Sequence, residues 1–180
     1  MKLLRTIRLD ASDTFVFEKA AEPGEWAVSG AFVFWGDDPS QLKGKARSAF
    51  RAGFLGVNSL GWSTLVQIVQ TDEAEREAVV ALLAQRLVES FGAPDSETAR
   101  RAAEEELTFA ESLCDQPLDT LIAVHRVYED GAVRESFRTL RPRNGPKPLR
   151  AFSFFEVEGE EEPQPGDRVD LVALAGKERK

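Results

Sequence analysis

The sequence predicts an α+β fold, in which a mostly antiparallel sheet carries an antiparallel pair of helices on one face. Three observations lead to this prediction. Strand-like segments occupy both ends of the chain, two long helical patterns fill its middle, and Asp130-Gly131 separates two further strand patterns. With 180 residues, of which 42% are hydrophobic, the chain has the size of one domain, and we expect a single domain over residues 1–180.

The first third of the chain has the pattern of β structure. Trp26 to Trp35 contains the aromatic and β-branched run Ala31-Phe32-Val33-Phe34-Trp35, which is typical of a strand covered on both faces. A Pro-Gly turn signal precedes it. We therefore expect three strands in this region, over residues 3–9, 14–17 and 26–35.

A helix, a glycine-rich loop and a central strand are expected next. Asp38 can cap a helix with Pro39 in its first turn, and Gly53 would end that helix after Ala52. Residues 53–61 contain three glycines and predict a loop. Residues 62–70 predict a strand. Leu65, Val66, Ile68 and Val69 make it nearly continuously apolar, which favours a position in the middle of the sheet.

Two long helices should form the helical pair. Asp72 with Glu75 resembles a capping box, and Gly92 is a stop signal after Phe91. A second helix should run from about Pro94-Asp95 to Cys114. The short connection between the two predicts antiparallel neighbours. Their expected contact residues are Val80, Leu83, Leu87 and Phe91 on the first helix, with Leu107 and Ala110 on the second.

The last part of the chain returns to β structure. Strands are expected over residues 120–129 and 132–140, joined by the two-residue turn Asp130-Gly131. That turn requires cross-strand partners whose residue numbers sum to 261, so Arg126 should face Glu135 as an exposed ion pair. By the same rule Val124 should face Phe137, and Tyr128 should face Val133. After a proline-rich loop, further strands are expected over residues 151–157 and 169–174.

Composition excludes several classes of protein. The net charge of −8 argues against nucleic acid as a partner and against general binding to an anionic membrane. No apolar run is long enough for a signal peptide or a membrane span, so we expect a cytoplasmic protein. One cysteine and one histidine cannot build a Cys- or His-rich metal site, and we expect no metal and no cofactor.

Candidate catalytic groups have weak support. The loop with Gly53, Gly56 and Gly61 follows a helix, whereas phosphate-binding loops precede one. Ser63 lacks the glycines of a nucleophile elbow, and Cys114 lies at the end of an apolar helix face, as structural cysteines do. His125 should neighbour Ser136 across the hairpin, but no third orienting carboxylate is near in sequence. We assign no catalytic residue, and the runs Glu104–Glu106 and Glu160–Glu162 are expected to be solvated surface.

The distribution of charge is the most informative feature. Residues 42–70 and 137–154 contain no acid, whereas residues 72–115 are strongly acidic. Basic segments on an acidic protein indicate a surface for an anion or an acidic partner, unless they neutralise the acidic helices of the same chain. We expect at least part of the two basic groups to meet on one face. The candidate anion- or partner-binding residues are Lys43, Arg47, Arg51, Arg138, Arg141 and Arg143.

Over residues 2–35 and 53–70, the chain resembles an uncharacterised bacterial family of small proteins, a family of unknown function. The resemblance rests on the overall run of residues, without a diagnostic short motif, and covers nearly the whole chain. It implies a gene neighbourhood with redox-enzyme accessory proteins and a protein similar to biotin/lipoate ligases. It implies no activity and no site residues.

These observations favour a non-catalytic accessory or protein-binding module, and the resemblance implies that it serves a redox-enzyme system. The alternative is a protein that binds an anionic small molecule, or an enzyme that acts on one, at an arginine-rich site. A ligand site requires a concave pocket with convergent polar groups, and a partner site requires an exposed apolar patch rimmed by charge. Both alternatives stay open from the sequence.

Overall fold

The computed structural model describes residues 1–142 and 155–157 of the chain. They form an α+β fold, as the sequence predicts, with one antiparallel sheet in the order β4-β3-β2-β1-β5-β6-β7-β8. The strands are β1 (Lys2–Ile7), β2 (Trp26–Val28), β3 (Phe54–Gly56), β4 (Trp62–Ser63), β5 (Leu65–Gln70), β6 (Leu121–Glu129), β7 (Ala132–Pro142) and β8 (Phe155–Val157). The helices are α1 (Ser12–Val16), α2 (Gly44–Ala52), α3 (Glu73–Phe91) and α4 (Ser96–Ser112), with short 3-10 turns η1 (Ala31–Phe34) and η2 (Pro39–Gln41).

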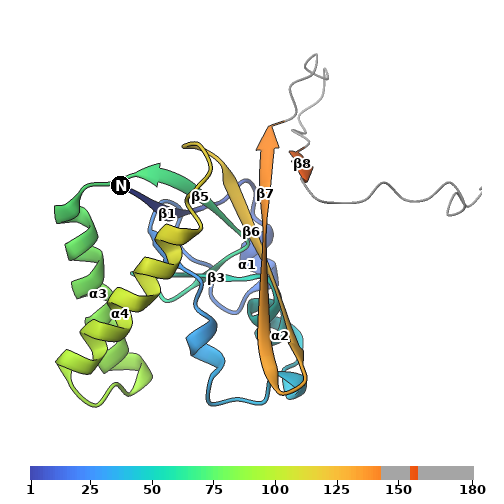
Figure 1. Cartoon of the computed structure of the whole chain (residues 1–180). Coiled ribbons are helices and arrows are strands. Elements are labelled where there is room, and N and C mark those ends of the chain that lie inside the picture. The colour runs from blue at the N-terminus through green and yellow to red at the C-terminus, as the bar shows by residue number, and fades with distance from the viewer. Residues whose placement is uncertain (143–154, 158–180) are drawn as a thin grey trace, which may run out of the picture.

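The helical pair α3 and α4 lies together on one side of the sheet (Figure 1), and α4 packs against β1 and β2. Asp72 and Glu75 form the predicted capping box, and Gly92 ends α3 in the left-handed conformation. The predicted contact residues Val80, Leu83, Leu87, Leu107 and Ala110 are buried, while Phe91 is only partly buried. None of the described helices is both long and apolar enough to cross a membrane.

The hairpin β6–β7 has the predicted register over its whole length, including Val124 opposite Phe137 and Tyr128 opposite Val133. Arg126 lies opposite Glu135, as predicted, but the expectation of an exposed pair is wrong. Arg126 is fully buried, because it follows Ile122 and Val124 on the inward face of β6. The strand β5 lies between β1 and β6, which confirms the predicted central position.

The predicted strand over residues 31–35 is wrong, because β2 ends at Val28 and the chain turns into η1. Gly30 adopts φ 77°, and a Cβ placed there would lie 2.6 Å from the Cβ of Leu55. The backbone is therefore pressed against β3 at a left-handed position that only glycine fits without strain. Beyond it, Phe34 packs into the core and Phe32 packs against Phe91 of α3, while Trp35 is exposed.

Three other expectations need correction. Residues 12–16 form helix α1, not a strand, and the buried carboxylate of Asp13 accepts hydrogen bonds from the backbone and hydroxyl of Thr64. The helix expected from Asp38 is two elements, since Asp38 caps η2 and α2 begins only at Gly44 after an extended Lys43. The expected loop over residues 53–61 contains β3. The expected strand over residues 169–174 lies outside the described residues.

Candidate functional site

The inner face of the hairpin holds a buried charge cluster centred on Arg126. Its Nε donates to Glu135 Oε1 at 2.6 Å. Its Nη1 donates to the carbonyl oxygens of Phe50 and Gly53, at 3.1 and 2.7 Å, and its Nη2 donates to the carbonyl and hydroxyl oxygens of Ser29. All five N–H groups of the guanidinium are therefore engaged. Arg126 joins the end of α2, the end of β2 and the hairpin.

Burial lowers the pKa of Arg126, but an arginine retains its charge in proteins. The Glu135 carboxylate is its counter-ion and also accepts a hydrogen bond from the Ser29 hydroxyl at 2.5 Å. Glu135 keeps a side-chain exposure of 18%, so the pair lies at the border of the core. Within this cluster the charges of Arg126 and Glu135 balance.

A second carboxylate, Glu106 on α4, lies near this cluster without a cation of its own. Its Oε2 is buried and has no hydrogen-bond partner among the described residues. Burial, the largest cause, and the nearby Glu135 carboxylate both raise the pKa of Glu106, and Arg126 opposes them; the resulting pKa is about 7. The carboxyl group is therefore half-ionised near neutral pH.

Glu106 lines a hollow between η1, the end of α3 and α4, which we call the aromatic hollow. Its volume is about 360 Å³. Phe32 and Phe91 meet edge to face in its wall, with ring centroids 5.3 Å apart, and Trp35 beside them is 78% exposed. Its lining includes Phe32, Val33, Trp35, Phe91, Ala102 and Glu106. An apolar wall with a carboxyl group suits a ligand that has both an apolar body and a hydrogen-bond donor.

The predicted basic residues of α2 line a different hollow, which we call the basic hollow. It has a volume of about 390 Å³ and is lined in part by Pro39, Arg47, Phe50, Arg51 and Tyr128. Arg47 and Arg51 are exposed, and no side-chain hydrogen bond or ion pair of theirs is found in the described part of the chain. Lys43 is also exposed and precedes α2 as its N-cap residue.

Of the second group of predicted basic residues, the structure describes the side chain of Arg138, which does not line the basic hollow. Arg138 lies on β7 opposite Ala123 and lines a separate hollow of about 350 Å³ with His125. Since residues alternate along a strand, Arg138 lies on the face of the hairpin opposite to Arg126 and Glu135. Arg141 is paired in register with Glu156 at the end of β7. The side chain of Arg141 and the whole of Arg143 lie outside the described residues.

The candidate nucleophiles are not arranged for catalysis. Ser136 is opposite His125, as predicted, but its hydroxyl donates to the His125 carbonyl oxygen at 3.2 Å and not to the ring. Ser63 is buried and donates to the Leu65 carbonyl oxygen. Burial raises the pKa of the Cys114 thiol to about 11, which leaves it protonated and unreactive. Among the described residues, no group of three or more His, Cys, Asp or Glu side chains could hold a metal ion.

Sequence reasoning missed Glu106, which it assigned to solvated surface. The signal was present, because Glu106 follows Ala99 and Ala103 at helical spacing and therefore borders the buried stripe of α4. Ion pairs within the helical pair are made by arginines other than those proposed. Arg76 pairs with Glu111 at 2.9 Å, and Arg100 bridges α4 to Glu77 on α3 at 2.6 Å.

The chain belongs to a family of unknown function, DUF6505, whose model matches residues 1–156. This confirms the expected membership of such a family. Neither the curated proteins nor the solved structures contain a match to the chain.

Proposed function

We propose that this protein is a non-catalytic protein-binding module, whose partner presents acidic and apolar side chains to helices α1 and α2. The observation that carries the proposal is the basic surface of α2. Lys43, Lys45, Arg47 and Arg51 are all exposed on a chain with a net charge of −8. A local positive surface on an acidic protein steers and orients an acidic partner.

Apolar side chains next to this surface support a protein partner over a small anion. On α1, which packs against α2, Phe15 is 74% exposed and Val16 is 40% exposed. An exposed apolar patch bordered by charge is the usual appearance of a protein-binding surface. Arginine and aromatic side chains are also the residue types enriched among those that contribute most to binding.

We propose that the protein acts in the cytoplasm. This agrees with its single cysteine, which cannot form an internal disulfide. The proposal also includes service to a redox-enzyme system, which the resemblance over residues 2–35 and 53–70 implies.

The second candidate function is binding of an anionic small molecule in the basic hollow. Its support is that Arg47 and Arg51 both line this concave site. Arginine suits bidentate recognition of a carboxylate or phosphate group. The apolar patch on α1 would have no role in this alternative.

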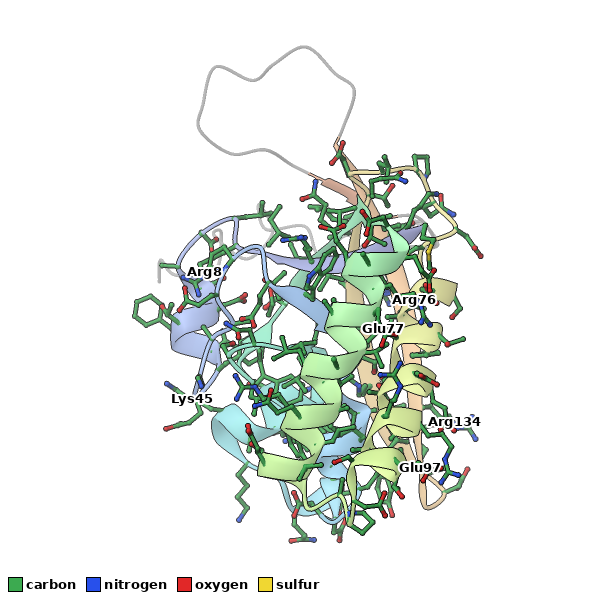
Figure 2. The ribbon with its side chains drawn as sticks, turned by 90° about the vertical axis from the view of Figure 1, so that its left-hand side faces the viewer. Arg8, Lys45, Arg76, Glu77, Glu97 and Arg134 are labelled. Carbon is green, nitrogen blue, oxygen red and sulfur yellow. The ribbon has the colours of Figure 1, made fainter. Side chains whose placement is uncertain are left out.

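The test compares three immobilised proteins as baits in an extract of the native host: the wild type, Arg47→Glu/Arg51→Glu, and the control Arg101→Glu/Arg134→Glu. The two variants change the net charge equally. Figure 2 shows Arg134 on the side of the molecule opposite to Lys45 of α2. The control changes residues of α4 and β7 and leaves the basic residues of α2 in place. Thermal unfolding establishes that both variants are folded.

We expect a protein that the wild type and the control capture at low salt, and that the α2 variant loses. Adding Phe15→Ala to the wild type should weaken the same interaction. Capture of the same proteins by all three baits would refute the role of α2. If no protein depends on α2, but phosphate or citrate binds saturably to the wild type and not to Arg47→Glu/Arg51→Glu, the small-anion alternative replaces the proposal.

A further inference from the structure

We propose that the aromatic hollow binds a small organic cation, a primary ammonium group attached to an aromatic or aliphatic body, with the Glu106 carboxylate as its counter-ion. This site is separate from the basic surface of α2 and does not depend on the function proposed above. Three features of the described residues lead to it: a carboxylate without a counter-ion, an apolar wall, and an exposed indole.

Among the described residues, the Glu106 carboxylate has no cation paired with it. Arg126 is the positive group that acts on it, but all five of the Arg126 N–H groups are engaged by Glu135, Ser29 and the carbonyl oxygens at the end of α2. The other charged groups that act on Glu106 are Glu135 on β7 and Glu105 on α4, and both are negative. An ionised Glu106 therefore adds an unbalanced negative charge in a desolvated place.

An ammonium group in the hollow would supply the missing charge and would donate a hydrogen bond to the Glu106 carboxylate. A metal ion fits this place less well, because Glu105 and Glu106 alone cannot provide the several oxygen ligands that Mg²⁺ or Ca²⁺ requires, and no group of three or more possible ligand side chains is found in the described part of the chain. An anionic ligand is disfavoured by the two glutamates in the lining, Glu105 and Glu106.

The wall of the hollow suits the apolar part of such a ligand. Phe32, Val33, Phe91 and Ala102 line it, and Trp35 at 78% exposure has an indole free to cover a bound ring or to contact the cation through its face. The volume of about 360 Å³ lies at the small end of ligand pockets. It matches a single ring or a short chain with one amine.

The test uses phenethylamine as the probe, with phenylethanol and phenylpropionate as its neutral and anionic counterparts. Each is titrated into the full-length protein at about pH 8, where Glu106 is mostly ionised and the amine is still protonated. Binding is followed by calorimetry and by indole fluorescence. A Trp35→Phe variant assigns the fluorescence change to Trp35, because the chain also contains Trp26 and Trp62.

We expect the amine to bind saturably and more tightly than the alcohol, with no binding of the carboxylate. Glu106→Gln should weaken amine binding about tenfold, since it removes the charge and keeps the shape. Its matched control is Glu97→Gln, which removes an exposed carboxylate of the same helix that does not line the hollow and should change the affinity less than about twofold. For the wild type, affinity should rise about tenfold between about pH 6 and about pH 8, as Glu106 ionises, and this rise should be absent in Glu106→Gln.

Each of the following results would overturn the proposal. One is that no saturable binding of the amine occurs at about pH 8. The second is equal binding of amine and alcohol, which would show an apolar hollow without a counter-ion. The third is an equal effect of the two glutamine variants, which would show general attraction to the acidic helix. Urea unfolding of both variants verifies that a loss of binding does not reflect a loss of fold.

Discussion

The replacement of Arg126 by methionine tests whether the buried charge cluster holds the hairpin, α2 and β2 together. Methionine retains the apolar stem but removes all five hydrogen bonds of the guanidinium. The carbonyl oxygens of Ser29, Phe50 and Gly53 then lose their donor, and the Glu135 carboxylate loses its counter-ion. Removing one partner of a buried ion pair costs about 3–5 kcal/mol.

We expect the free energy of unfolding to fall by that amount, which corresponds to a decrease in Tm of about 6–20 °C for a domain of this size. Arg126→Lys should be intermediate, because one ammonium group keeps the charge but cannot reach acceptors on three elements at once. Urea unfolding followed by circular dichroism measures both variants. The control is Arg134→Met on the adjoining strand, whose side chain is 63% exposed and whose loss should cost less than about 0.5 kcal/mol.

A double-mutant cycle with Glu135→Gln separates the ion pair from the carbonyl contacts. If the pair contributes as argued, the loss in Arg126→Met/Glu135→Gln is smaller than the sum of the two single losses, because no carboxylate is left unpaired. The reasoning is refuted if Arg126→Met unfolds at the wild-type urea midpoint with an unchanged slope.

Two further variants test the core and the second carboxylate. Leu83 on α3 is fully buried, so Leu83→Ala should cost about 2–5 kcal/mol in urea unfolding through lost burial and a cavity, and an unchanged midpoint would contradict its place in the core. The raised pKa of Glu106, about 7 against an ordinary 4.5, means that the stability contributed by its protonated form is complete below about pH 4.5 and is lost as the pH rises through about 7. Glu106→Gln should therefore gain stability relative to the wild type across this window, by up to about 3 kcal/mol, and parallel pH profiles of the two proteins would show that Glu106 is solvated.

Features that depend on a few neighbouring residues could be predicted from the sequence. The capping box at Asp72 and Glu75 and the stop at Gly92 are local hydrogen-bond and backbone preferences, so α3 has the bounds that these signals predict, within one residue. The turn Asp130-Gly131 likewise determines the register of β6 and β7, because a two-residue turn leaves one way to pair the strands. The α+β class follows from such elements, since each has one apolar face that must be covered.

Features that depend on contacts between distant segments were decided only by the tertiary structure. The run of residues 31–35 has strand propensity, yet Gly30 packs so closely against Leu55 and the ring of Trp62 that the chain leaves the sheet before that run. A propensity is a small free energy per residue, and close packing against another strand exceeds it.

The same reason applies to the candidate sites. Alternation along β6 places Arg126 inward, but only the approach of α2 and β2 supplies the three carbonyl oxygens that allow an arginine to be buried there. Helical spacing places Glu106 beside the buried stripe of α4. The environment of its carboxylate is formed by residues of β6, β7 and η1, which lie outside α4 in the sequence. The sequence determines which residues can carry a charge, whereas the fold determines their partners and their pKa values.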